Sequence, residues 1–105
     1  MKAFPAFMAA AFALAGSATT VMAEQFQWDG GGNIVKEGGL WVEYPPHAGQ
    51  IHFTFSELAR AEGYVLLFDS SRSFILRLPL AGGPASWLTP GKDNWVVYKN
   101  VLHIP

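Results

Sequence analysis

The chain of 105 residues contains no cysteine, so no disulfide bond can stabilise it. Small exported domains often depend on disulfides, and this chain must instead be stabilised by burial of apolar side chains. Charge is also sparse, with seven basic and eight acidic side chains and no run of one sign. This balance argues against binding to nucleic acid or to an anionic membrane surface, both of which favour clustered Lys and Arg.

The motifs of common catalytic and cofactor sites are missing as well. The sequence has no Gly-x-Ser-x-Gly, no phosphate-binding loop, no His-Glu-x-x-His and no EF-hand pattern. The histidines lack the close spacing that is typical of zinc ligands; they are His47, His52 and His103. Asp69, Ser70 and Ser71 resemble a turn more than a nucleophile site. We therefore expect no enzymatic activity, no metal and no cofactor, with a small hydrolase as a minor alternative.

Residues 1–23 have the pattern of a secretory signal peptide. Lys2 gives a positive start, an apolar segment follows, and small side chains at positions 21 and 23 precede the predicted cleavage site. We expect cleavage before Glu24, with cleavage after Ala18 as the alternative. The sequence therefore predicts an exported protein that is periplasmic or extracellular.

Residues 24–105 form the predicted single small domain. Loss of Lys2 with the leader leaves six basic side chains against eight acidic ones, a net charge of −2. No further apolar segment approaches the roughly 20 residues that a membrane span requires. We expect a soluble domain without membrane contact after cleavage of the leader.

Short apolar segments alternate with turn residues along this domain, which is typical of small all-β proteins. The clearest strands are predicted at 40–44, 51–55, 64–68 and 73–78. The last two form a hairpin across 69–72, with Phe74, Leu76 and Leu78 predicted on the inner face. Residues Lys99 and Asn100 are interpreted as the turn of another hairpin. The expected fold is all-β, a small antiparallel β-sandwich or open barrel of about six to eight short strands with one short helix.

The short helix is predicted over 56–63. Ser56 is a favourable N-cap, Glu57 suits the positive helix start, and Gly63 suits the C-terminal position. Such a helix has fewer than two turns and would depend on packing against the sheet. Glu57 and Arg60 are expected to pair with each other, or with Arg72 and Asp69 nearby, in surface ion pairs of small energetic value.

A binding surface is the main functional hypothesis. If Leu40, Val42 and Tyr44 face the core, strand alternation places Trp41 and Glu43 outside. The same reasoning extends the exposed surface to further strands, and an exposed Trp beside polar groups suits a sugar ring or a partner's side chain. Trp87 lies between Pro84 and Pro90 in a short segment that is predicted at a rim. The predicted ligand-binding residues are Trp41, Glu43, His52, Arg77 and Trp87. The alternative is that both Trp rings are buried and that Arg77 pairs with Glu43.

The sequence thus predicts an exported, non-enzymatic binding module that recognises a glycan or a partner protein. The alternative is a structural or self-assembling exported protein whose aromatic faces are subunit interfaces. In that case the strand pair from Tyr64 to Leu78 would supply edge-to-edge association.

Overall fold

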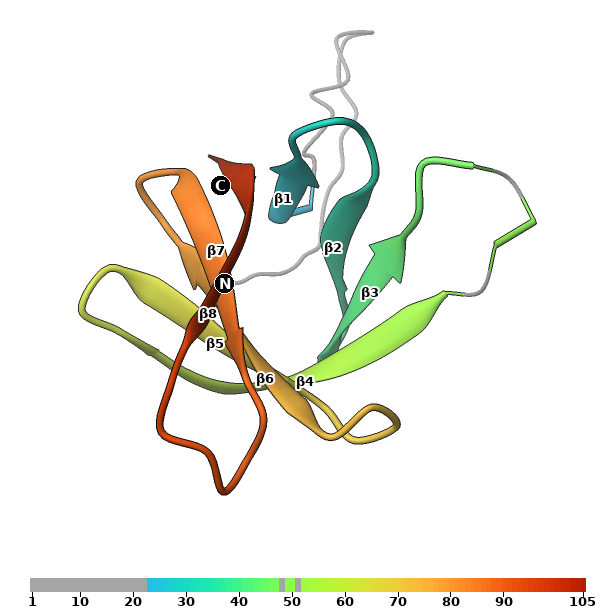
Figure 1. Cartoon of the computed structure of the whole chain (residues 1–105). Coiled ribbons are helices and arrows are strands. Elements are labelled where there is room, and N and C mark those ends of the chain that lie inside the picture. Colours follow the sequence, from blue (N-terminus) through green and yellow to red (C-terminus); the bar gives the residue numbers. More distant parts are fainter. Residues whose placement is uncertain (1–22, 48, 51) are drawn as a thin grey trace, which may run out of the picture.

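The computed structural model describes residues 23–47, 49–50 and 52–105, which form a closed antiparallel β-barrel (Figure 1). Consecutive strands are neighbours, and β1 also pairs with β8. The strands are β1 (Gln25–Trp28), β2 (Asn33–Glu37), β3 (Leu40–Tyr44), β4 (Phe53–Ala61), β5 (Tyr64–Asp69), β6 (Phe74–Pro79), β7 (Gly83–Leu88) and β8 (Val96–Ile104). No helix in this part of the chain is long and apolar enough to cross a membrane. The predicted signal peptide lies outside the described residues except for Ala23.

The prediction of an all-β antiparallel fold is confirmed, whereas the sandwich and the open barrel are both wrong because the sheet closes on itself. Closure depends on β8, which is continuous through Lys99 and Asn100, so the hairpin predicted there is wrong as well. The first half of β8 pairs with β7, where Val96 lies opposite Trp87. The second half pairs with β1 and leaves no free edge between the first and last strands.

The predicted helix at 56–63 is also wrong, because these residues continue β4 and then form the turn to β5. Pairing with β3 and β5 supplies the backbone hydrogen bonds that so short a helix would lack. The register shifts between Glu57 and Ala59, which marks a β-bulge at Leu58. Since Glu57 and Arg60 lie opposite buried residues of β5, the bulge turns both charged side chains toward the barrel interior.

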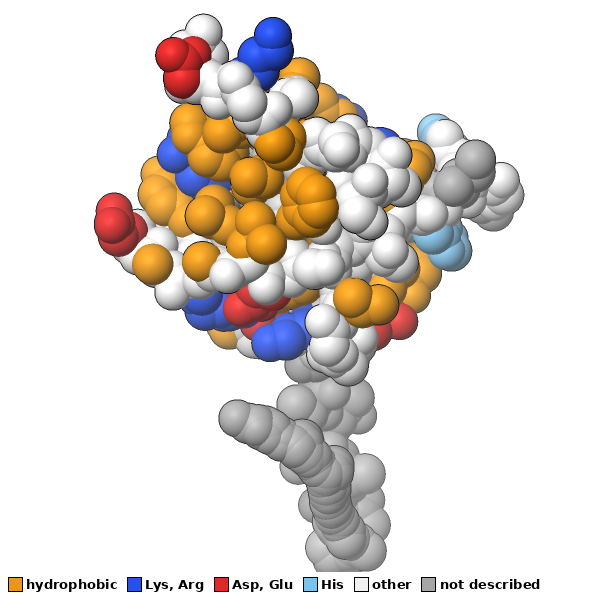
Figure 2. All heavy atoms as spheres, turned by 90° about the horizontal axis from the view of Figure 1, so that it is seen from below, with side chains coloured by type: hydrophobic (Ala, Val, Ile, Leu, Met, Phe, Trp, Pro, Cys, Tyr) orange, Lys and Arg blue, Asp and Glu red, His pale blue; other side chains and the backbone are white. Residues whose placement is uncertain are grey.

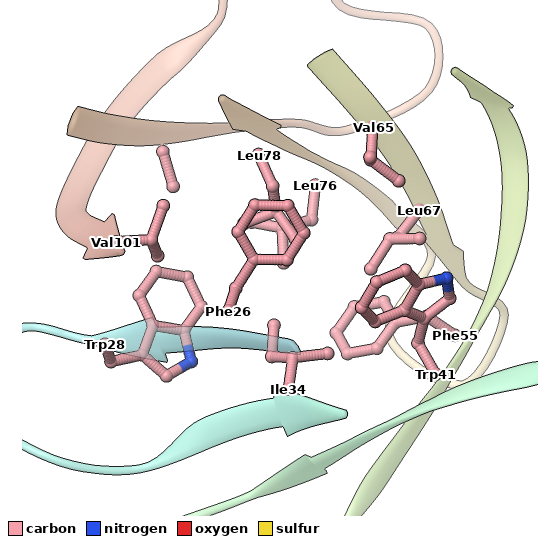
Figure 3. Packing of buried hydrophobic residues seen from close by; sticks show 11 residues of the cluster. Phe26, Trp28, Ile34, Trp41, Phe55, Val65, Leu67, Leu76, Leu78 and Val101 are labelled. Atoms are coloured by element: carbon pink, nitrogen blue, oxygen red, sulfur yellow. The ribbon is translucent and has the colours of Figure 1, made fainter. Parts of the chain in front are cut away.

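The core fills the barrel with aromatic and branched aliphatic side chains, as Figure 3 shows. Its buried hydrophobic residues are Phe26, Trp28, Ile34, Trp41, Phe55, Val65, Leu67, Leu76, Leu78, Ala85 and Val101. The inward orientation predicted for Leu76 and Leu78 is confirmed. The orientation predicted for β3 is wrong, because Trp41 is 1% exposed while Leu40 is 46% exposed. β3 is apolar on both faces, so alternation alone could not show which face the barrel would bury.

Candidate functional site

One end of the barrel contains a cavity of about 300 Å³ that is lined mainly by aromatic side chains. The turns at this end join β1 to β2, β3 to β4, β5 to β6 and β7 to β8. The described residues that line the cavity are Trp28, Glu43, Phe55, Arg72, Phe74, Leu76, Trp87, Thr89 and Tyr98. An up-and-down barrel brings the end of each odd-numbered strand beside the start of the next one. Residues far apart in the sequence therefore share this cavity.

The aromatic rings of the cavity pack edge to face. Phe74 contacts Trp87 with 6.1 Å between ring centroids, and it contacts Phe55 at the same separation. Trp28 and Tyr98 form a second such pair at 5.4 Å. These orientations are the favoured ones for aromatic pairs. The rings thus support one another and keep an apolar wall around the cavity.

The turn between β5 and β6 positions Arg72. Asp69, which is 1% exposed, accepts hydrogen bonds from the backbone amides of Ser71 and Arg72, and this confirms the predicted turn. Burial alone would raise the pKa of the Asp69 carboxyl, but the hydrogen bonds from Ser71 and Arg72 lower it below its ordinary value. Asp69 also accepts a hydrogen bond from Arg72 Nε. The buried, ionised carboxylate therefore fixes the guanidinium at the end of the barrel.

Arg72 lies between aromatic rings and a second carboxylate. Its guanidinium carbon is 3.6 Å from the centroid of the Phe53 ring and 4.7 Å from that of Phe74. Its Nη2 donates to Glu43 Oε1 at 3.3 Å. Both side chains of this pair are partly exposed and both line the cavity. The cavity wall thus presents hydrogen-bond acceptors and donors side by side.

Trp28, which lines the cavity, carries a further polar group, its indole N–H. This nitrogen is buried and has no hydrogen-bond partner among the described residues. Buried donors without a partner are rare and cost free energy. An acceptor that reached it, from water or from a ligand, would remove this cost.

The opposite end of the barrel holds a network of charged side chains. Arg60 donates two hydrogen bonds to Glu24, at 2.8 and 3.0 Å, and one to Glu57 at 3.2 Å. His103 Nε2 lies 2.8 Å from Glu24, and Trp41 Nε1 donates to Glu57 at 3.0 Å. Burial alone would raise the pKa of both carboxyls. Hydrogen bonds from Arg60 and His103 lower the pKa of Glu24 below its ordinary value, and those from Arg60 and Trp41 lower the pKa of Glu57. This end is therefore occupied by ion pairs, whereas the aromatic end has room for a ligand.

The structure separates the five residues predicted to form one binding surface. Glu43 and Trp87 line the cavity. Trp41 is in the core, and its predicted exposure is wrong. His52 is exposed and packs edge to face on Tyr44. Arg77 lies on the outer face of β6, and its predicted alternative partner is wrong because Glu43 pairs with Arg72.

Sequence reasoning missed Arg72, Phe74 and Tyr98 as cavity residues. The sequence predicts Arg72 only as a turn residue and as an alternative partner in a surface ion pair, not as part of a cavity wall. Phe74 was correctly placed on the inner face of its strand, but only as a core residue. The position of Tyr98 depends on pairing between the chain's distant ends, which local patterns do not reveal.

No group of three or more metal-ligating side chains lies together among the described residues. Comparison with protein-family models, with curated proteins and with solved structures gives no match.

Proposed function

We propose that the chain is an exported, non-enzymatic binding module that holds one sugar ring of a glycan in the aromatic cavity. The observation that carries this proposal is the pair Glu43 and Arg72 within an aromatic wall. The C–H faces of a pyranose ring pack well on aromatic rings, while its hydroxyls need both donors and acceptors. A carboxylate and a guanidinium side by side supply both to neighbouring hydroxyls.

The size of the cavity also supports a small ligand group. Its volume of about 300 Å³ lies at the lower limit of small-molecule sites, roughly 300–1,000 Å³. One ring of a glycan, or one side chain of a partner protein, is thus a better match than a large cofactor. The hydroxyl-matching pair favours the glycan, and a partner's side chain is the other ligand to be tested.

The number of carboxyl groups in the cavity supports binding rather than hydrolysis. Glycoside hydrolysis usually needs two carboxyl groups, one of which is protonated and acts as the acid. Glu43 is the one carboxyl among the described residues that line the cavity, and it pairs with Arg72. Hydrogen bonds outweigh burial and lower the pKa of nearby Asp69, so Asp69 is not suited to act as a proton donor at neutral pH.

The test is binding of neutral oligosaccharides to the protein purified after export, measured by intrinsic fluorescence and by NMR shifts of the indole N–H groups. We expect saturable binding of at least one oligosaccharide class. Glu43→Gln should weaken it about tenfold or more, the usual effect of losing a hydrogen bond to a charged group. Trp87→Leu should weaken it as well.

Trp95→Leu is the matched control, because Trp95 is outside the cavity lining. It should leave saccharide binding unchanged. Absence of binding across the panel, or loss of binding in Trp95→Leu alone, would refute the proposal. If peptides change the NMR shifts of the cavity residues and no saccharide does, the cavity would be assigned to a partner protein.

Self-assembly is the second candidate, supported by apolar side chains exposed on the described barrel. Val97 is 71% exposed and Leu102 is 60% exposed. Edge-to-edge association has no basis at β5 and β6, because each is already paired on both sides. Face-to-face contact is the remaining route, and sedimentation at increasing concentration tests it. A monomer at all concentrations would rule against it.

A further inference from the structure

Arg77 differs from the other two arginines in its ionic contacts. Arg60 pairs with Glu24 and Glu57, and Arg72 pairs with Asp69 and Glu43. No carboxylate oxygen of the described residues lies within 4.0 Å of the Arg77 guanidinium. A half-buried cation without a partner has lost part of its hydration without gaining an ion pair.

The Arg77 guanidinium is nevertheless held in a defined position. It lies on the outer face of β6, opposite Leu66 of β5 and Ser86 of β7. Its Nε donates a hydrogen bond to Ser86 Oγ at 3.0 Å. Its guanidinium carbon is 4.2 Å from the centroid of a Trp95 ring and 5.0 Å from that of Tyr64. With Nε engaged by Ser86, the two Nη groups make no hydrogen bond to the described residues.

A hollow of about 230 Å³ lies beside this guanidinium on the outside of the barrel. Its described lining residues are Ala59, Ala61, Glu62, Tyr64, Leu66, Arg77 and Trp95. The alanines of β4 leave the space, because larger side chains at the same positions would fill it. Figure 2 shows the molecule from below the view of Figure 1; hydrophobic side chains form a patch on this face, with both basic and acidic side chains at its edge.

We propose that this hollow is a second binding site, which takes an organic monocarboxylate. The carboxylate accepts hydrogen bonds from the free Nη groups of Arg77, since a guanidinium matches a carboxylate in shape and charge. The apolar part of the ligand packs over Ala59, Ala61 and Leu66. Glu62 at the rim repels a second negative charge, so the site favours one carboxylate over a phosphate or a polyanion. A free acid and the C-terminal carboxylate of a peptide share this chemistry.

The test uses the exported protein and two probes of similar shape, benzoate and its neutral counterpart benzamide. Binding is followed by NMR through the Trp95 indole N–H and the Arg77 Nε–H. We expect saturable shifts with benzoate at an affinity at least tenfold higher than with benzamide. Glu62→Gln should strengthen benzoate binding two- to fivefold. Equal binding of the two probes, or no binding of benzoate, would overturn the proposal.

Substitutions test whether benzoate binds at Arg77. Arg77→Gln should abolish the preference for benzoate over benzamide. Arg77→Lys, which keeps the charge but not the planar fork, should weaken benzoate binding about tenfold. Lys99→Gln removes the same charge from a residue outside the lining and should leave benzoate binding unchanged. If Lys99→Gln and Arg77→Gln weaken benzoate binding equally, the binding depends only on net charge and the proposed site is refuted. If Arg77→Gln fails to fold, the comparison of benzoate with benzamide and the Arg77→Lys variant still test the proposal.

Two further comparisons identify the source of the carboxylate and separate this site from the aromatic cavity. A short peptide with a free C-terminus that binds more tightly than its amidated form and than benzoate would assign the site to a partner's C-terminus. Tighter binding of benzoate would assign it to a free acid. Glu43→Gln should leave benzoate binding intact, so failure of the glycan proposal would not affect this result.

Discussion

Replacement of Trp41 by Phe should destabilise the barrel far more than the same change at Trp87. Trp41 is 1% exposed and its Nε1 donates to Glu57 at 3.0 Å. Loss of a hydrogen bond to a charged group costs about 1.5–3 kcal/mol. The lower value applies here, because the Glu57 side chain is 28% exposed and water can replace the donor. Partial emptying of the core adds about 1–2 kcal/mol, less than the 3–5 kcal/mol of Trp→Ala.

The expected loss for Trp41→Phe is therefore about 3 kcal/mol out of the roughly 4–12 kcal/mol that a domain of about 80 residues possesses. It should lower Tm by about 12–24 °C and lower the urea midpoint without changing the slope of the transition. Trp87 is half-buried and makes no side-chain hydrogen bond to the described residues. Trp87→Phe should thus cost less than about 1 kcal/mol.

Urea unfolding of the three proteins, followed by circular dichroism, checks this difference. Equal destabilisation by the two variants would refute the assignment of Trp41 to the core and of Trp87 to a cavity wall. Acrylamide quenching gives an independent reading, since an indole at position 41 should be shielded while one at position 87 should be partly accessible. A quenchable Trp41 would contradict the observed orientation of β3.

Two other perturbations follow from the same contacts. Acidification should unfold the barrel below about pH 4, because the carboxyls of Glu24, Glu57 and Asp69 have lower pKa values in the folded chain than in the unfolded chain. The stabilisation from these carboxylates is present above the pKa of the unfolded chain and is lost as the pH falls through the pKa of the folded chain. Thermal unfolding from about pH 7 to about pH 2 measures this, and a constant Tm would contradict it. Gly32→Ala should cost about 1 kcal/mol or more, because Gly32 has φ +87° and an added Cβ would lie 3.0 Å from a backbone oxygen. Gly39→Ala, where no atom lies within 4 Å of such a Cβ, is its control in urea unfolding and should be nearly neutral.

Local features of the fold could be predicted from the sequence because their causes are local. The hairpin of β5 and β6 follows from two apolar segments that flank a turn, and Asp69 binds the turn amides as its residue type suggests. The inner face of β6 follows from alternation. Closure could not be predicted in the same way, because it depends on β8 pairing with both β7 and β1, at opposite ends of the chain.

The candidate cavity could be predicted only in part for the same reason. Trp41 and Glu43 do share one face, as alternation requires, but it is the inner face. Glu43 therefore reaches the cavity at the end of β3 while Trp41 enters the core. Trp87 was predicted at a rim and does line the cavity at the end of β7. Which residues meet Glu43 and Trp87 is set by the barrel register, which no segment encodes alone.

The mistaken helix at 56–63 has a physical cause that can be tested at Leu58. The bulge there interrupts alternation, so Glu57 and Arg60 both point inward although they are three positions apart along a strand. Deletion of Leu58 should remove the bulge and restore regular alternation, with Arg60 still opposite Val65 on the inner face. The hydrogen bonds of Arg60 to Glu24 and Glu57 should therefore remain.

Arg60→Gln, by contrast, removes these ion pairs. Because the Arg60 side chain is 35% exposed, this substitution should cost about 2 kcal/mol, below the 3–5 kcal/mol of breaking a buried pair. Without Arg60, the pKa of Glu24 should rise toward its ordinary value, so the stability of Arg60→Gln should depend less on acid pH. Leu58→Thr is the control for the deletion, since Leu58 is 52% exposed and a β-branched residue tolerates the strand; it should change stability by less than about 0.5 kcal/mol. Urea unfolding at neutral and acid pH compares the deletion with Arg60→Gln. A deletion variant that loses acid sensitivity as Arg60→Gln does would contradict the inward position of Arg60 without the bulge.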